Sequence, residues 1–137
     1  MKTFFDSSAF AKRYVDEPGS EAVESLCAAA TELALSVVCI PELISAFNRR
    51  AREQSLSSRQ YEVAKENMSA DMRDAAIVNL TPQVITTCTT ILKASPVRAM
   101  DALHIACAVQ WGAELFVSAD KRQVSVAKRA GLRTRLV

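Results

Sequence analysis

Four acidic residues from distant parts of the chain are the side chains best suited to do chemistry: Asp6, Glu42, Asp101 and Asp120. Carboxylates that gather in one place repel one another and raise each other's pKa values, so a protein that collects them usually holds a cation. Oxygen ligands without histidine or thiolate favour Mg²⁺ or Mn²⁺ over zinc. Such a site supports phosphoryl transfer or phosphodiester hydrolysis, in which one or two metals activate a water molecule and stabilise the leaving oxygen.

Each acid also has a plainer interpretation. Asp6 and Asp120 could cap the helices that follow them, and Glu42 suits the first turn of a helix because of the macrodipole. Asp101 is harder to explain in this way, because its helix is apolar nearly all round and a buried carboxylate needs a partner. Arg98, three residues earlier, could supply that partner, and so could a bound cation.

Strand-like and helical segments alternate along the chain. We expect strands at 2–5, 33–40, 75–80, 114–117 and 132–136, and helices at 8–15, 20–30, from Pro41 onward, 57–73, 82–93, 97–110 and 121–129. Ser20 and Ser95 are the expected N-caps of the helices that follow them. This alternation predicts an α/β fold, a three-layer α/β/α sandwich around a central parallel sheet of four to five strands.

The connections of such a sheet bring the four acids together. A helix that follows one strand and leads into the next begins at the carboxyl edge of the sheet, where ligands bind in open α/β folds. Asp6 and Asp120 come just after strands, while Glu42 and Asp101 lie in the first turns of helices. We therefore expect all four carboxylates at one edge.

The bulk composition indicates one ordinary domain spanning residues 1–137, with 17 basic and 15 acidic residues and a net charge of +2. This balance does not by itself argue for nucleic acid. No apolar run is long enough for a membrane helix, so we expect a cytoplasmic protein with no membrane partner. The four cysteines form no C-x-x-C pair and are expected to be reduced, buried thiols. The one histidine, His104, is expected to pack or to make a surface hydrogen bond rather than to catalyse.

Four segments resemble the signature segments of PIN-domain nucleases, whose short bacterial members are the VapC-like toxins of toxin–antitoxin pairs. The segments are F-F-D-S-S-A at 4–9, P-E-L at 41–43, R-A-M-D-A-L-H-I-A-C-A at 98–108 and V-S-A-D at 117–120. The resemblance covers nearly the whole chain in the right order. It implies the strand order 3-2-1-4-5, which places the first and fourth strands side by side.

The resemblance also implies a function and a set of roles. The four acids would be the acidic quartet of a Mg²⁺- or Mn²⁺-dependent endoribonuclease acting as a toxin. Asp6 and Asp101 would be the principal metal ligands, Asp120 would complete the metal shell partly through water, and Glu42 would support a second metal or position the attacking water. The hydroxyls of two serines, Ser8 and Ser118, would hold carboxylates or metal-bound water. The implied partners are an RNA substrate, a small cognate antitoxin and a second copy of the chain in a homodimer.

Basic residues flank the acids and could bind RNA phosphates around them. They are Lys12 and Arg13 beside Asp6, Arg49, Arg50 and Arg52 beside Glu42, and Lys121 and Arg122 beside Asp120. As isolated charges, such residues more often belong to a solvated helix face. Four apolar side chains of the middle helices could likewise be core, which we favour, or a surface for a partner: Phe47, Tyr61, Met68 and Met72.

The sequence is also compatible with two other functions. One is a non-catalytic module whose acidic pocket receives a basic peptide. The other is an aspartyl-phosphate phosphotransferase with Asp6 as its nucleophile. Those enzymes usually carry a second acid two residues after the first, where this chain has Ser8, and this counts against the phosphotransferase.

Overall fold

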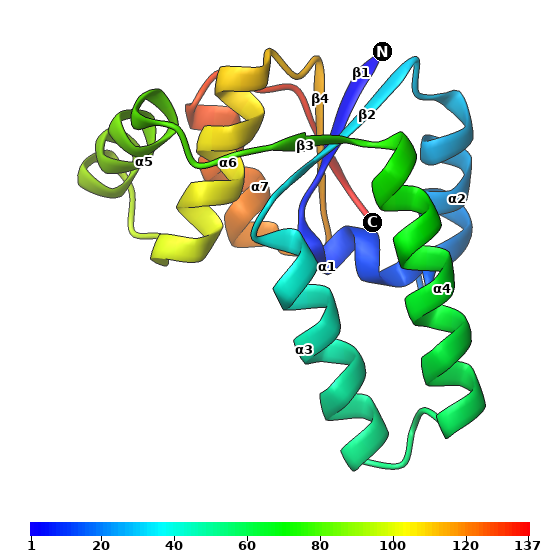
Figure 1. Cartoon of the computed structure of the whole chain (residues 1–137). Helices are drawn as coiled ribbons and strands as arrows, with labels where there is room; N and C mark the ends of the chain where they lie inside the picture. Colours follow the sequence, from blue (N-terminus) through cyan, green and yellow to red (C-terminus); the bar gives the residue numbers. More distant parts are fainter.

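The computed structural model describes residues 1–137 and contains a five-stranded parallel sheet with helices on both faces (Figure 1). The strands are β1 (Lys2–Phe5), β2 (Glu32–Ser36), β3 (Ala76–Val78), β4 (Leu115–Ser118) and β5 (Thr134–Leu136). Their order is β3-β2-β1-β4-β5, and every adjacent pair is parallel. The predicted α/β/α class and strand order are therefore confirmed.

The helices divide between the two faces of the sheet. They are α1 (Ser7–Phe10), continued by the 3-10 turn η1 (Ala11–Arg13), then α2 (Ser20–Ala29), α3 (Cys39–Arg52), α4 (Ser58–Asp74), α5 (Pro82–Ala94), α6 (Ala99–Trp111) and α7 (Lys121–Arg129). Successive strand residues point to opposite faces. Phe4 of β1 accordingly packs in a core cluster with α5, α6 and α7, while Phe5 packs in a second cluster with α1 to α4.

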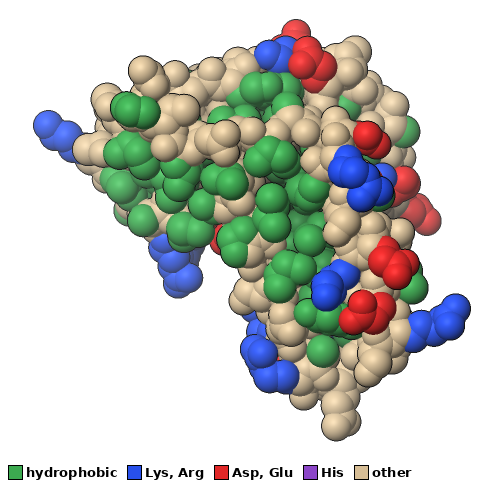
Figure 2. Space-filling model, viewed as in Figure 1, with side chains coloured by type: hydrophobic (Ala, Val, Ile, Leu, Met, Phe, Trp, Pro, Cys, Tyr) green, Lys and Arg blue, Asp and Glu red, His purple; other side chains and the backbone are tan.

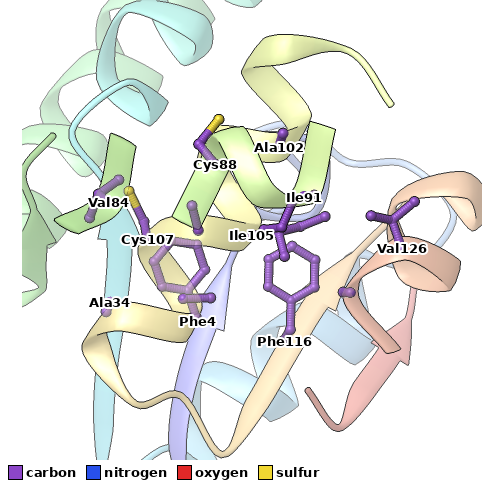
Figure 3. Packing of buried hydrophobic residues seen from close by; sticks show 13 residues of the cluster. Phe4, Ala34, Val84, Cys88, Ile91, Ala102, Ile105, Cys107, Phe116 and Val126 are labelled. Atoms are coloured by element: carbon purple, nitrogen blue, oxygen red, sulfur yellow. The ribbon is translucent and has the colours of Figure 1, made fainter. Parts of the chain in front are cut away.

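The first of these cores is organised around two stacked rings. Phe4 and Phe116 lie on neighbouring strands with ring centroids 5.9 Å apart, and Ile91, Ile105 and Val126 from the three covering helices surround them (Figure 3). Helix α6 is buried on most of its surface, as its nearly continuous apolar sequence predicts. Anything polar on α6 therefore has to find its partners inside the protein.

The second core extends into a pair of helices, α3 and α4, which project beyond the sheet (Figure 1). Ser57 and Gln60 form a capping box that begins α4. Phe47 and Met68 are buried in this core, and Tyr61 and Met72 pack against it half-buried, so their assignment to the core is confirmed. Hydrophobic side chains also gather on the outer face over α5 and β3 and continue toward the space between α3 and α4 (Figure 2).

Some predicted boundaries are wrong near the carboxyl edge. The helix expected at 8–15 is split into α1 and η1, and the strand expected to reach residue 40 ends at Ser36. Helix α3 begins at Cys39, two residues before Pro41. Proline is tolerated there because the amide groups of a first helical turn have no partner within the helix.

The expected N-caps at Ser95 and Ser20 are also wrong. Ser95 ends α5 in an extended conformation, which is favoured for a residue that precedes proline, and Arg98 occupies the N-cap position of α6. Ser20 is the first helical residue of α2, and Gly19 precedes it with φ of 98°, a conformation that glycine adopts without steric cost. None of the helices has the length and apolar character needed to cross a membrane.

Candidate active site

The carboxyl ends of β1 and β4 lie side by side and form the centre of the candidate site. The Asp6 amide donates a hydrogen bond to the Val117 carbonyl at 3.0 Å, which continues the pairing of these strands. Asp120 follows the end of β4, while Glu42 and Asp101 lie in the first turns of α3 and α6. The four acids thus come to one edge of the sheet, although they are not equally placed there.

Asp6 is the most buried of the four acids, with only 1 % of its surface exposed. Its Oδ1 accepts hydrogen bonds from the Ser8 hydroxyl at 2.8 Å and the Ala9 amide at 2.9 Å, and its Oδ2 accepts one from the Ser118 hydroxyl at 2.5 Å. Burial raises the pKa of Asp6 above its ordinary value, although these hydrogen bonds act against the rise. Asp6 therefore caps α1 and also presents a held carboxylate at the strand end, so the two interpretations of this residue coexist.

Glu42 is held by a contact that the sequence did not reveal. His104 Nε2 lies 2.5 Å from Glu42 Oε1, and the Ser7 hydroxyl donates to the same oxygen at 2.7 Å. Partial burial acts to raise the pKa of Glu42, but the hydrogen bonds from His104 and Ser7 outweigh it and hold that pKa below its ordinary value. Glu42 is therefore a fixed, ionised carboxylate.

His104 is 2 % exposed, so the expected packing is confirmed and the alternative, a surface hydrogen bond, is wrong; its contacts lie inside the site. Its Nε2 also lies 3.3 Å from the Ser7 hydroxyl, while its Nδ1 is buried without any partner. A ring that carries its hydrogen on Nε2 can donate to Glu42 and leaves only a bare nitrogen unpartnered, which costs less than a buried N–H without an acceptor. The spacing of three residues from Asp101 was a signal that His104 lies on the same side of α6 as that acid, but it does not identify Glu42 as the partner.

Asp101 keeps both of its carboxylate oxygens free of hydrogen bonds and ion pairs, and it is half-buried. Burial and the charges of Asp120 and Glu42 raise the pKa of Asp101 above its ordinary value. Arg98, one of the two partners considered for Asp101, makes no ion pair with it and opposes the rise only through its nearby charge. An acid in this condition gains stability from a nearby cation.

Asp120 caps α7, as one of the two interpretations of this residue predicts. Its Oδ1 accepts from the amides of Arg122 at 2.8 Å and Gln123 at 3.5 Å. Gln123 is buried, and its side-chain amide donates to the Asp101 carbonyl at 3.1 Å, so one residue ties the start of α7 to the start of α6. Nothing in the sequence marked Gln123. Asp101 and Asp120 line a common hollow of about 230 Å³ with Arg98, Arg122 and the backbone that precedes α6.

The four carboxylates retain free acceptor positions of the kind that a hard cation uses. Asp6 Oδ2 accepts a single hydrogen bond, one oxygen of Glu42 and one of Asp120 accept none, and neither oxygen of Asp101 accepts any. No three acidic, histidine or cysteine side chains lie close enough together to hold one ion between them. Mg²⁺ is usually held by one or two carboxylates and completed by water. The donor set therefore fits a hydrated divalent ion and does not fit a metal enclosed by protein ligands alone.

The predicted basic rim is partly used inside the protein. Lys12 and Arg50 both pair with Glu17, at 3.4 Å and 2.6 Å, and Arg13 binds the Asp71 carboxylate through two nitrogens at 2.8 Å and 3.1 Å. These three cations are therefore committed to acids on other elements, which proximity in sequence could not show. No ion pair is made by the other four, Arg49, Arg52, Lys121 and Arg122.

Solved structures with the same fold cover nearly the whole chain. FitAcB from Neisseria gonorrhoeae has a TM-score of 0.70, with 14 % identity over 96 % of this chain and 95 % of that one. VapC20 from Mycobacterium tuberculosis, a sarcin-ricin loop cleaving toxin, has a TM-score of 0.70, with 17 % identity over 96 % of each chain. VapBC2 from Rickettsia felis, bound to a DNA fragment from its promoter, has a TM-score of 0.69, with 14 % identity over 100 % of this chain and 99 % of that one.

Comparison by sequence gives the family. No curated protein matches the chain. The sequence model of the PIN domain matches residues 3–129, which include all four acids, the strands β2, β3 and β4, and β1 except for its first residue. Because this match spans most of the chain and the fold agrees with it, the chain belongs to the PIN domain family.

Proposed function

We propose that this protein is a metal-dependent endoribonuclease that hydrolyses RNA phosphodiester bonds as the toxin of a toxin–antitoxin pair. The observation that supports the proposal most strongly is the environment of the Asp101 carboxylate. This acid keeps both oxygens free at the sheet edge, where burial and, after it, the charges of Asp120 and Glu42 raise its pKa. Mutual repulsion among acids is costly unless a cation offsets it.

The residues divide into ligands and supports. Asp6, Asp101 and Asp120 would hold Mg²⁺ or Mn²⁺, partly through water, and Glu42 would orient the attacking water. The ion supplies the activation of that water and stabilises charge on the leaving oxygen. Ser8 and Ser118 fix the Asp6 carboxylate by donating to it, and His104 and Ser7 fix Glu42 in the same way. These hydrogen bonds orient the acids before substrate arrives.

The substrate and partners of the proposal follow from charge and from the structural neighbours. Unpaired Arg49, Lys121 and Arg122 are available to bind RNA phosphates, whereas Lys12, Arg13 and Arg50 would first have to leave their ion pairs. The neighbours include a toxin–antitoxin complex from Klebsiella pneumoniae and a DNA-bound VapBC from Salmonella typhimurium. A small antitoxin and a second copy of the chain are the partners proposed here, and the apolar face over α5 and β3 offers them a surface (Figure 2). The cytoplasm is the proposed location.

The phosphotransferase alternative is weakened by the environment of Asp6. Three donors hold its carboxylate, and the side chain is almost wholly buried. A nucleophile must reach a phosphorus atom that already carries its other oxygens, and the burial of Asp6 leaves room at Oδ2 for a small cation rather than for a phosphoryl group. The non-catalytic module is distinguished by experiment.

The test is cleavage of labelled single-stranded RNA by the purified protein with Mg²⁺ or Mn²⁺. Asp101→Asn removes the free carboxylate and should lower the cleavage rate by about 100-fold or more, with the circular dichroism spectrum unchanged. Asp16→Asn is the matched control, because Asp16 is exposed and has no side-chain contact in the site. Full activity in excess chelator, or in the Asp101→Asn variant, would rule out the metal mechanism. Absence of cleavage by the wild-type protein under all metals would favour the non-catalytic module.

A further inference from the structure

A larger hollow adjoins the one that contains Asp101 and Asp120. It measures about 440 Å³ and is lined by Pro96, Lys121, Arg122, Ser125, Val126 and Arg129. We call it the α7 groove. Pro96 and Arg122 also line the smaller acidic hollow, so the two hollows share part of their wall. A ligand that reaches the acids at one end can therefore extend along α7.

The lining of the α7 groove comes from one stripe of the helix. Its residues are spaced by one, four, five and eight positions from Lys121, which places them along one side of a helix with 3.6 residues per turn. Lys128 also belongs to α7 and is exposed, but it does not line the groove. The helix therefore offers a charged residue inside the groove and a similarly charged residue outside it, next to each other in sequence.

The charge of the α7 groove has one sign. Lys121, Arg122 and Arg129 line it, no acidic residue does, and none of the three forms an ion pair. Arg129 is oriented by a hydrogen bond from its Nη1 to the Ser95 hydroxyl at 3.4 Å. Arg98 adds a fourth cation where the groove meets the acids. Basic residues that merely balanced the acidic site would be expected to pair with those acids, and none of these cations does.

The length of the basic stripe suits a chain of phosphates better than a single anion. Lys121 and Arg129 are eight residues apart on α7, which corresponds to roughly 12 Å at 1.5 Å per residue. About three to four phosphates of a single strand span such a length, given a rise of about 3.4 Å per stacked nucleotide. A basic peptide segment that approached the acids along this path would be repelled by the cations of the groove. The groove therefore favours a negatively charged chain.

We propose that the α7 groove binds the sugar–phosphate backbone of single-stranded RNA on one side of the scissile phosphate, which lies over Asp101 and Asp120. This inference rests on the proposed function and adds the path that the RNA strand takes across the protein. The strand runs from the acids along α7 past Lys121 to Arg129. It does not run past Lys12, Arg13 and Arg50, whose charges are already paired.

The test is binding of a fluorescent oligouridine to the cleavage-deficient Asp101→Asn protein in Mg²⁺, measured by anisotropy over a series of salt concentrations. The variant pair Lys121→Gln and Arg129→Gln together removes two charges from the groove. The pair Lys128→Gln and Arg135→Gln removes two exposed charges outside it. We expect the first pair to weaken binding about tenfold and to reduce the salt slope by about 1.4, at 0.7 per phosphate contact. The second pair should change affinity by less than about twofold.

Neutral methylphosphonate linkages test the direction. They are placed on one side of the cleavage position in one oligonucleotide and on the other side in a second. Only one of the two oligonucleotides should bind the Asp101→Asn protein more weakly, and this difference should disappear once Lys121 and Arg129 are replaced. Equal binding by the groove and control variants would overturn the inference, as would equal sensitivity on both sides of the cleavage position. Displacement of the RNA by a polyglutamate peptide of matched charge, with the same dependence on Lys121 and Arg129, would instead make the groove a site for acidic peptides. Cleavage by the wild-type protein is measured separately. Absence of cleavage would refute the nuclease proposal, whereas equal binding by the groove and control variants would refute the groove proposal alone.

Discussion

The pair formed by His104 and Glu42 gives a sharp prediction about stability. His104→Ala and Glu42→Ala each remove one partner of a 2.5 Å contact, and the double variant removes both. His104 is 2 % exposed, so its truncation also leaves a cavity between α6 and α3. Glu42 is half-buried, and after loss of the ring it retains only the hydrogen bond from Ser7.

The magnitudes follow from these contacts. A hydrogen bond to a charged group contributes about 1.5–3 kcal/mol, and truncation of a buried ring adds about 2 kcal/mol or more for lost packing. We therefore expect His104→Ala to lower the free energy of unfolding by about 3–5 kcal/mol. Glu42→Ala should cost about 1–2 kcal/mol, because it leaves His104 Nε2 with only the 3.3 Å contact to the Ser7 hydroxyl but also removes one charge from the repelling acids. The double variant should be about 1.5–2 kcal/mol more stable than the sum of the single effects implies.

Urea unfolding followed by circular dichroism measures all four proteins at neutral pH. Glu66 supplies the control, because it is exposed on α4 and makes no contact with His104. His104→Ala combined with Glu66→Ala should be additive. If the losses of unfolding free energy in His104→Ala and Glu42→Ala also add within about 0.5 kcal/mol, the contact does not hold Glu42 in place and the reasoning is refuted.

Three further predictions concern separate contacts. Ser118→Ala removes a donor to Asp6 and should raise the pKa of that acid further. RNA cleavage should fall about 10–100-fold. The deficit should be larger at lower pH, where more Asp6 is protonated, and a pH series of kcat measures it. Asp71→Asn should lower the free energy of unfolding by about 1–3 kcal/mol at neutral pH. Partial burial acts to raise the pKa of Asp71, but Arg13 and Tyr14 hold it below its ordinary value, so the wild-type advantage in urea unfolding should disappear as the pH falls through that lowered pKa. Gly112→Ala should lower stability by about 1–2 kcal/mol in thermal unfolding, because Gly112 ends α6 with φ of 79° while an added Cβ meets only the Lys2 amine at 3.8 Å.

The sequence predicted those parts of the fold that depend on local pattern. Helix α6 was identified as buried from its nearly continuous apolar residues, and α4 was expected at 57–73, one residue from its observed bounds at each end. The arrival of Asp6 and Asp101 at one edge followed from the geometry of parallel α/β connections, without knowledge of contacts. The strand order came from resemblance to PIN domains, because alternation alone does not distinguish between orders.

The features that the sequence did not reveal depend on partners from distant elements. His104 holds Glu42, which lies 62 positions away in the chain, and Arg13 is bound by Asp71, 58 positions away. Neither partner can be identified from spacing along one helix. The start of α6 was misplaced for a local reason, since Ser95 was interpreted as the cap of the next helix while the following proline made it the end of α5.

The central claim is that a divalent ion lies among the carboxylates at the ends of β1 and β4. Crystals soaked in Mn²⁺ and measured for anomalous scattering test it most directly. The account predicts an anomalous peak bound by Asp101 and by Asp6 or Asp120, present in the wild-type protein and lost in Asp101→Asn. A wild-type protein with no Mn²⁺ at this edge, or with Mn²⁺ bound equally well after Asp101→Asn, would contradict it.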